Sequence, residues 1–314
     1  MKLVNVVRAG DIRPLTIASY KNLVDVASLG KKTEDPGDGN VKGYTIDGNG
    51  KLTEMPGSVR TLTGRPSSAE FTPDGKFLLV TEIISGNIHS FSVADNGLLS
   101  EKPVSSITSP KATKERFIAL PVGTKIVAGK NGNNTLLVTE TRFVAAPEKY
   151  YPSSPQHREK YPFLPLYEGQ AGSMTSYNID PNGKLTMVSA DVIAGSSYWV
   201  GQQAVCWVTV SPVGKYAWTT NPLTSSLSTY AIADNGSIKL VDEIAYQDGG
   251  YNEYLLDVDL SADGHFLNAV SGSTGRTWVF KINHKTGELA LVNGYEGGPL
   301  IHSYGLVTIP AHPK

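Results

Sequence analysis

The chain has 314 residues, enough for one large all-β domain or two smaller ones. Its 28 Lys and Arg nearly balance 29 Asp and Glu, and no basic run marks a nucleic-acid partner. Only 18% of the residues are charged, whereas there are 32 Gly and 19 Pro, which favours strands joined by turns over long solvated helices. The single cysteine, Cys206, cannot form an internal disulfide and is interpreted as a buried side chain.

The first eleven residues, MKLVNVVRAGD, predict a lone outer strand that leads into the first repeat. They hold too few apolar residues for a signal-peptide core or a membrane span. We therefore expect no membrane partner and a cytoplasmic location if this N-terminus is complete. Secretion stays open if an upstream segment is missing.

An Asn-Gly-type turn recurs along the chain and ends at Gly50, Gly97, Gly183, Gly236 and Gly287. The successive intervals are 47, 86, 53 and 51 residues. Such turns supply the positive φ angles that tight hairpins need. An aromatic residue precedes each of them by six or seven positions: Tyr44, Phe91, Tyr177, Tyr230 and Phe280.

A second turn lies earlier in the same unit, as in PDGK at 73–76, PVGK at 212–215 and ADGH at 262–265. Each unit therefore predicts four antiparallel strands, A to D, repeated about every fifty residues, which is the signature of a β-propeller blade. Five complete units are expected near 11–59, 66–104, 114–191, 202–246 and 252–296.

The long interval contains EKYYPSSPQHREKYPFLPLYEGQ, residues 148–170, within a loop at 143–171 inserted in the third repeat. Its prolines and aromatics give stiffness and apolar area, unlike a disordered linker. We interpret it as a lid or a protein-binding arm. The alternative is a loop packed flat over the blade edges.

The last predicted element, LIHSYGLVTIP at 300–310, resembles a lone strand A. Residues 1–314 are thus predicted to form a single all-β propeller domain with five complete repeats and a single strand at each end. Either the ring is irregular, or material upstream of Met1 is missing.

Three stretches carry a family resemblance: RPSSAEFTPDGKFLLVTEIISGNIHSFSVADNG, AVCWVTVSPVGKYAWTTNPLTSSLSTYAIADNGSI and DVDLSADGHFLNAVSGSTGRTWVFKINHKTGEL. Together they resemble the lactonase-type seven-bladed β-propellers, which include 6-phosphogluconolactonase-like proteins and 3-carboxy-cis,cis-muconate cyclases. The resemblance implies a small anionic lactone or carboxylate as substrate. It is carried by blade-forming motifs, so it specifies the fold better than the chemistry.

The motif LLVTE occurs twice, and it ends at Glu82 and at Glu140. In a propeller the B–C and D–A loops share one face, so both carboxylates should point toward the same rim. We interpret them as candidate general acids or bases, with Arg142 as a clamp for a carboxylate or phosphate. The other interpretation is a salt bridge between blades or a carboxylate that caps loop amides.

Further candidates follow from equivalent blade positions on that face. His302 is added as a catalytic candidate, and the candidates for substrate binding are Arg116, Tyr198, Gln203, Asn221 and Tyr254. The six histidines show no paired-ligand spacing and no phosphate-binding glycine motif is present, so we expect neither a metal nor another cofactor.

Two functions follow from this pattern. The first is a lactonase or lactonizing cycloisomerase that uses metal-independent acid/base chemistry. The second is a non-catalytic propeller that binds a ligand or protein through its loop-bearing face. The enzyme hypothesis predicts that Glu82, Glu140, Arg142 and His302 converge in one pocket, and separate structural salt bridges would count against it.

Overall fold

The computed structural model describes residues 3–31, 37–129, 132–145, 167–248, 253–298 and 305–309. In these residues there is no α-helix, and so none that is long and apolar enough to cross a membrane. The strands form five antiparallel sheets in which four strands follow one another in chain order, confirming the predicted propeller blades. The observed sheets lie within or close to the five predicted units.

The first blade contains β1 (Pro14–Tyr20), β2 (Leu23–Ser28), β3 (Asn40–Ile46) and β4 (Leu52–Glu54), and the short β5 (Arg60–Thr61) also pairs with β3. The second contains β6 (Pro66–Phe71), β7 (Phe77–Glu82), β8 (Asn87–Ser92) and β9 (Ser105–Thr108). The third contains β10 (Leu120–Ala128), β11 (Asn134–Thr141), β14 (Ser173–Ile179) and β15 (Leu185–Ile193).

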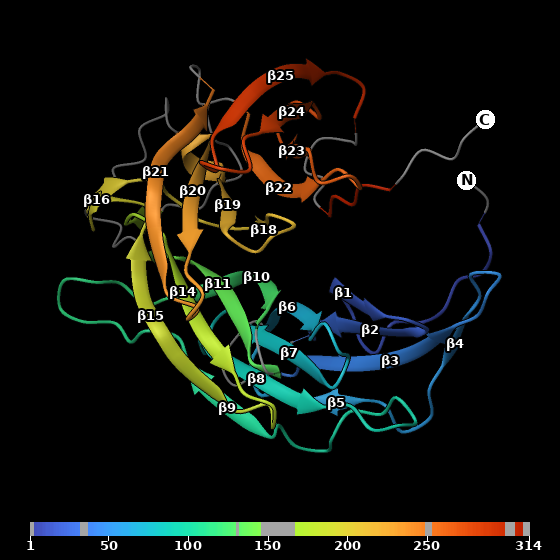
Figure 1. Cartoon of the computed structure of the whole chain (residues 1–314). Coiled ribbons are helices and arrows are strands. Elements are labelled where there is room, and N and C mark those ends of the chain that lie inside the picture. Colours follow the sequence, from blue (N-terminus) through green and yellow to red (C-terminus); the bar gives the residue numbers. More distant parts are fainter. Residues whose placement is uncertain are drawn as a thin grey trace.

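The fourth blade contains β18 (Val208–Val210), β19 (Tyr216–Asn221), β20 (Ser226–Ile232) and β21 (Ile238–Gln247), with a 3-10 turn η2 (Pro222–Thr224) after β19. The fifth contains β22 (Leu255–Leu260), β23 (Phe266–Ser271), β24 (Thr277–Ile282) and β25 (Leu289–Tyr295). Figure 1 shows the five blades side by side around a common centre, with the first strand of each blade innermost. These inner strands contact one another in succession from β1 to β22.

The apolar core lies between blades rather than inside any one of them. In one cluster, Phe77 and Leu79 of the second blade pack with Leu136, Val138 and Tyr177 of the third. Similar clusters join the first blade to the second, the third to the fourth, and the fourth to the fifth. The second, third and fourth sheets therefore have a core cluster on each face, and middle strands such as β7 are wholly buried.

The recurrent aromatics occupy one structural position, on the third strand of each blade. Tyr44 and Phe91 are 1% exposed, and Tyr177, Tyr230 and Phe280 are 0% exposed. Their spacing in the sequence therefore reports a large side chain that each blade contributes to the core.

Turn glycines also pack against the preceding blade. Gly183 has φ +80°, and a Cβ atom there would lie 2.4 Å from Cε1 of Phe77, the first residue of β7. Gly287 has φ +77° and stands in the same relation to Tyr216, the first residue of β19, at 2.5 Å. Glycine is needed at these turns both for its backbone conformation and for the close approach of the neighbouring ring.

The prediction of single strands at both ends was wrong for the described residues. No strand forms at 3–9 or 305–309, because neither segment has a backbone ladder to join. Side chains hold them instead. The Asn5 amide exchanges two hydrogen bonds with the Leu52 backbone, at 2.9 and 3.1 Å. Asp257 accepts hydrogen bonds from the backbone N–H groups of Gly305 and Leu306, at 2.9 and 2.7 Å.

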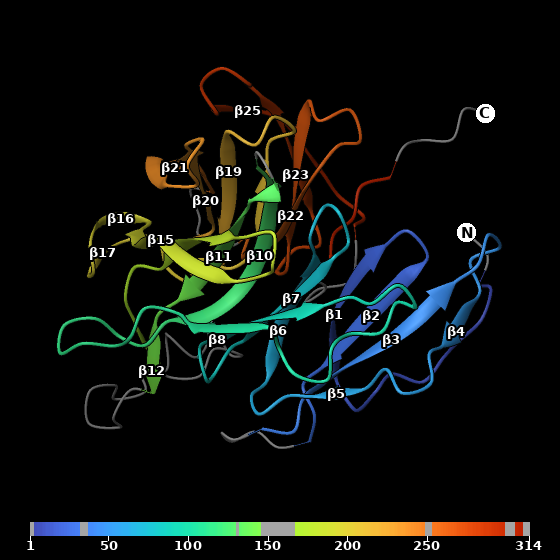
Figure 2. The ribbon, with the colours of Figure 1, turned by 60° about the horizontal axis from the view of Figure 1, so that its bottom comes forward.

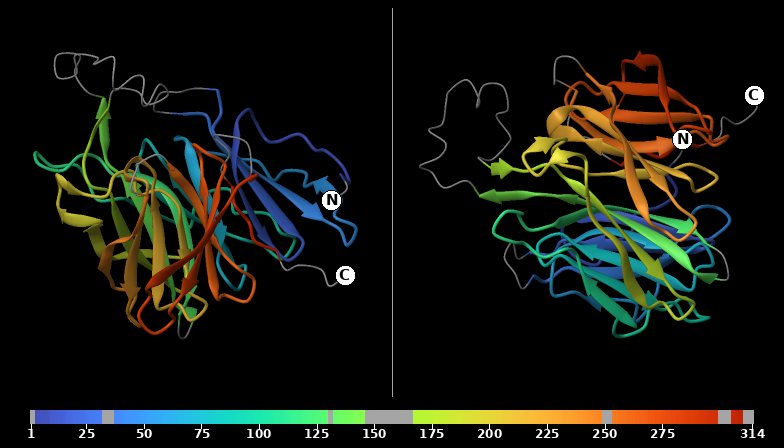
Figure 3. Two further views of the ribbon diagram at one scale, coloured as in Figure 1. Left: turned by 90° about the horizontal axis from the view of Figure 1, so that it is seen from above. Right: turned by 60° about the vertical axis from the view of Figure 1, so that its left-hand side comes forward.

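The inserted loop begins and ends as a two-stranded ribbon, β12 (Phe143–Ala145) with β13 (Tyr167–Gly169). Figures 2 and 3 show this ribbon projecting from the third blade. Residues 146–166, which carry most of the proposed lid or arm, lie outside the described residues.

Replacing Gly183 by Ala tests the double role of the turn glycines. We expect a loss of unfolding free energy of about 1 kcal/mol from the positive φ, and a further loss of about 1–3 kcal/mol from the clash with Phe77. Gly50 is the matched control, because its φ is also +80° but its nearest neighbour, Val4, lies at 3.7 Å. Urea denaturation measures the unfolding free energy of G183A and of G50A. Equal losses of unfolding free energy in the two variants would contradict the packing role of Gly183.

Candidate functional site

The loop-bearing end of the third blade gathers two arginines and two carboxylates. Glu140 ends the LLVTE motif in β11, and Arg142 lies between β11 and β12. Arg116 comes from the loop before β10, and Asp191 comes from β15 with φ 49°. We call these four residues the third-blade ion cluster.

Arg142 is the centre of the cluster. Its Nη2 lies 2.6 Å from Asp191 Oδ1 and 3.1 Å from Glu140 Oε2. Its Nη1 donates to the carbonyl of Phe117 at 2.8 Å. The Ser173 hydroxyl donates to Glu140 Oε2 at 2.7 Å, so the carboxylate is held from two sides.

Arg116 closes the cluster from the neighbouring loop. Its Nε and Nη2 bind the Asp191 carboxylate in a bidentate manner at 2.9 and 2.8 Å, the geometry that makes guanidinium pairs strong. Its Nη1 donates to the carbonyl of Ala171 at 2.6 Å. The Tyr198 ring lies over the guanidinium at 4.7 Å. These contacts tie the base of the inserted loop to both adjoining loops.

The cluster is buried and its charges balance. The side chains of Glu140 and Arg142 are 0% exposed, that of Arg116 is 3% exposed and that of Asp191 is 17% exposed. Burial raises the pKa of Glu140, against the opposing charge of Arg142. Burial would also raise the pKa of Asp191, but the hydrogen bonds from Arg116 and the charge of Arg142 outweigh it and lower that pKa. Glu140 is therefore protonated before Asp191 as the pH falls.

Glu82 occupies the equivalent strand position in the second blade, but its described partners belong to a separate network. Its Oε1 accepts a hydrogen bond from the Gly64 N–H at 2.9 Å, and its Oε2 accepts one from the Ser85 hydroxyl at 2.6 Å. His89 Nε2 lies 3.5 Å from Oε2. Burial would raise the pKa of Glu82, but these three partners outweigh it and lower the pKa to about 2. Glu82 thus fits the interpretation of a carboxylate that caps loop amides.

The remaining candidates are spread over two blades. Asn221 is fully buried and donates to the hydroxyls of Ser226 and Ser228, at 3.0 and 2.8 Å. Gln203 forms a β-bridge with Ala171, beside the third-blade ion cluster. Tyr254 lies just before β22, the first strand of the fifth blade, and its backbone N–H donates to the Ser225 hydroxyl at 3.2 Å. Burial raises the pKa of the Tyr254 phenol. His302 lies outside the described residues.

Asp191 is the cluster member that sequence reasoning missed. It follows Glu140 by about fifty positions, in an outer strand of which only the first residue, Leu185, is buried. No spacing rule connects it with Arg142, and only the pairing of β14 with β15 brings it to the cluster. The left-handed conformation, which Asp tolerates better than most residues, was the local feature that sequence could not reveal.

Exposed and half-buried apolar and aromatic side chains lie next to the cluster. Trp199 is 57% exposed and contacts Phe117 edge-on at 5.4 Å. Ile118 and Val200 are 39% and 59% exposed. We call Phe117, Ile118, Tyr198, Trp199 and Val200 the aromatic rim.

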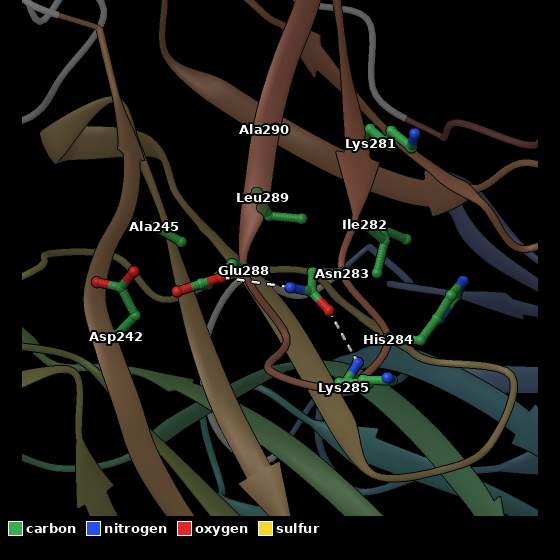
Figure 4. Close-up of a pocket in the computed structure, with 10 residues that line it drawn as sticks. All are labelled: Asp242, Ala245, Lys281, Ile282, Asn283, His284, Lys285, Glu288, Leu289 and Ala290. Carbon is green, nitrogen blue, oxygen red and sulfur yellow. Dashed lines mark hydrogen bonds between the residues drawn. The ribbon is translucent and has the colours of Figure 1, made fainter.

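A groove of about 800 Å³ lies elsewhere, between the fourth and fifth blades. Figure 4 shows Asp242 and Ala245 on one side of it and the turn from Asn283 to Glu288 on the other. None of the residues predicted as site residues lines this groove, and its charged side chains are of both signs. The third-blade ion cluster is therefore the better match to the expected site.

Comparisons with known proteins agree with this architecture. The fold defines a β-propeller of four-stranded blades. Residues 166–299 match the family described as lactonase, 7-bladed beta-propeller, which confirms the resemblance to lactonase-type propellers. A 6-phosphogluconolactonase of Formosa agariphila is 26% identical in an alignment of 270 residues that covers 82% of this chain. The chain spans 65% of the length of that relative.

Solved structures share the fold at lower identity. A candidate 6-phosphogluconolactonase from Bacteroides uniformis superposes with a TM-score of 0.66 at 15% identity, over 96% of this chain and 77% of that one. The periplasmic gluconolactonase PpgL of Pseudomonas aeruginosa gives 0.59 at 18% identity, over 90% of this chain and 72% of that one.

Glu82→Gln should remove a pH-dependent contribution to stability. Because the folded pKa is lowered from 4.5 to about 2, the carboxylate stabilises the fold above about pH 4.5, and this stabilisation is lost as the pH falls toward 2. The shift corresponds to at most about 3 kcal/mol. Urea unfolding at about pH 7 and about pH 3 should show a larger deficit at the higher pH. The exposed Glu101→Gln serves as control, and a deficit independent of pH would contradict the role of the charge.

Arg142→Met should cost about 3–5 kcal/mol of unfolding free energy, because it leaves two carboxylates buried without their shared cation. Arg276→Met is the matched control: Arg276 also lies between two carboxylates, those of Glu253 and Glu296, but its side chain is 30% exposed. Its removal should cost about 1 kcal/mol or less. Guanidinium unfolding compares the two, and similar losses would show that burial of the cluster does not matter.

Proposed function

We propose that this chain hydrolyses, or in reverse closes, a small anionic lactone at the loop-bearing end of its third blade. The observation that carries the proposal is the lactonase match of residues 166–299, because that stretch supplies Asp191 and Tyr198 to the Arg116–Arg142 site. The gluconolactonase neighbours support a sugar lactone as the substrate class.

The proposed reaction needs one proton acceptor and one proton donor. Water adds to the lactone carbonyl carbon and gives up a proton, the ring C–O bond breaks, and the ring oxygen takes a proton to leave a hydroxy acid. Glu140 is proposed to transfer these protons, because a carboxyl with a raised pKa changes protonation state closer to neutral pH. Asp191 stays ionised and holds the two guanidinium groups in place.

Arg116 and Arg142 are proposed to attract the anionic group of the substrate. Both are paired in the described structure, so the anionic group of the substrate would have to take the place of Asp191, the most exposed member of the cluster, at one of the two guanidinium groups. Tyr198 and Gln203 flank that side and are the proposed substrate contacts. Asn221 and Tyr254 are proposed to border the same face from the next blades, and His302 keeps its catalytic proposal on sequence grounds alone. The proposed chemistry calls on side chains and water, without a metal.

A second candidate function is ligand or protein binding without turnover. It is favoured by the ion pairs in which all four charges of the cluster take part, and by the exposure of Trp199 and Val200 on the aromatic rim. A propeller fold alone does not distinguish the two functions.

Matched variants at the two LLVTE positions test the enzyme. We expect lactone hydrolysis above the spontaneous rate, measured by acid release from glucono-lactone, 6-phosphoglucono-lactone and muconolactone. Glu140→Gln should lower turnover by about 100-fold or more, as expected when a general acid or base is lost. Glu82→Gln, the isosteric change in the neighbouring blade, should keep turnover within about threefold.

Circular dichroism and thermal unfolding show whether each variant is folded, and Glu140→Asp provides a second reading if Glu140→Gln is unstable. Full turnover in folded Glu140→Gln would overturn the assignment of Glu140. If the wild-type chain shows no turnover with any lactone but binds one in calorimetry, the binding function replaces the enzyme.

A further inference from the structure

Two histidines meet on the face of the fifth blade opposite the loop-bearing face. His265 lies in the turn before β23, and His284 follows β24. His265 Nδ1 and His284 Nε2 are 3.4 Å apart, and the ring centroids are 5.5 Å apart at an angle of 63°. Figure 4 shows His284 at the edge of the groove, on the far side from Asp242.

This separation suits a shared metal ion better than a hydrogen bond. N–H hydrogen bonds to acceptors are usually about 2.7–3.2 Å long, so 3.4 Å is a weak contact. Two imidazole nitrogens on a tetrahedral zinc ion, each about 2.0–2.1 Å from the metal, lie about 3.4 Å from each other. The two ring nitrogens already stand at the spacing that coordination requires.

The backbone holds both turns in this relation. The Ile282 N–H donates to the His265 carbonyl at 3.0 Å, which joins the two turns through the β23–β24 ladder.

The fourth blade anchors the His284 turn at two points. The Tyr216 hydroxyl donates to the Lys285 carbonyl at 2.7 Å, and the Trp218 Nε1 donates to the Gly287 carbonyl at 2.9 Å.

The surroundings leave room for solvent ligands. His265 is exposed and His284 is partly exposed. The charged neighbours in the two turns are Asp263, whose Oδ1 accepts from the His265 N–H at 3.0 Å, and Lys285. Within the described ranges, no group of three or more His, Cys, Asp or Glu side chains is placed to hold a metal ion, so water would complete the coordination.

We infer that His265 and His284 form a surface site for a divalent transition-metal ion, with Zn²⁺ as the representative ligand. The sequence gives no sign of such a site, because the two histidines are separated by a whole hairpin rather than by a short ligand spacing. The site is separate from the proposed lactone chemistry and does not depend on it.

Isothermal titration of the untagged full chain with Zn²⁺ tests the site. We expect saturable binding of one ion per chain, or of one per two chains if a second copy supplies the other two nitrogens. His265→Ala and His284→Ala should each weaken binding by about tenfold or more, the scale on which altered metal sites lose affinity.

His89→Gln is the matched control, since it removes a histidine of the second blade that contacts Ser106 and Glu82, and binding should be unchanged. Sedimentation of the same samples distinguishes the two stoichiometries. No saturable binding by the wild-type chain, or binding that survives both alanine substitutions, would overturn the inference.

Discussion

The packing of each blade against the next blade in the chain is the constraint on which the rest of this structure depends. No blade has an apolar interior of its own, and each core cluster takes side chains from two consecutive blades. A sheet covered on both faces needs apolar residues on both sides of its middle strands, and that is why the repeats read as short, nearly continuous apolar runs. The nearly constant spacing of Tyr177 and Phe280, six and seven residues before their turn glycines, follows from the same packing.

Stacking also fixes where polar residues can gather. The last residues of the buried strands lie at the edge of the core. Their side chains therefore contact the loops of adjoining strands. Glu82 and Glu140 stand at the same point of neighbouring blades, yet one accepts hydrogen bonds from its own B–C loop and the other binds Arg142. The repeat sets the position of a carboxylate, and the local loop sets its chemistry. The pKa values of the two groups shift in opposite directions, because burial outweighs the charge of Arg142 at Glu140, whereas the hydrogen bonds and His89 outweigh burial at Glu82.

The insertion in the third repeat gains a structural meaning from the cluster. Gln170, at its C-terminal base, donates to the Glu115 carbonyl at 2.6 Å and accepts from the Phe117 N–H at 2.8 Å. The loop before β10, which contains Glu115 and Phe117, also carries Arg116. The Arg116 side chain pairs with Asp191 in β15, the outermost strand of the blade. The C-terminal base of the insertion is therefore bonded to the loop that supplies Arg116 to the third-blade ion cluster.

The sequence by itself determined the blades, their number of complete repeats, the recurrent core aromatics and the two equivalent glutamates, because each depends on contacts that repeat at a fixed spacing. Only the tertiary structure decided that Asp191 joins Arg116 and Arg142, that Glu82 belongs to a different network, and that the terminal segments are held by Asn5 and Asp257 instead of by a strand ladder. It also brought His265 to His284. These contacts join residues of unrelated spacing through loop geometry and a left-handed backbone angle, and no periodic pattern in a sequence encodes them.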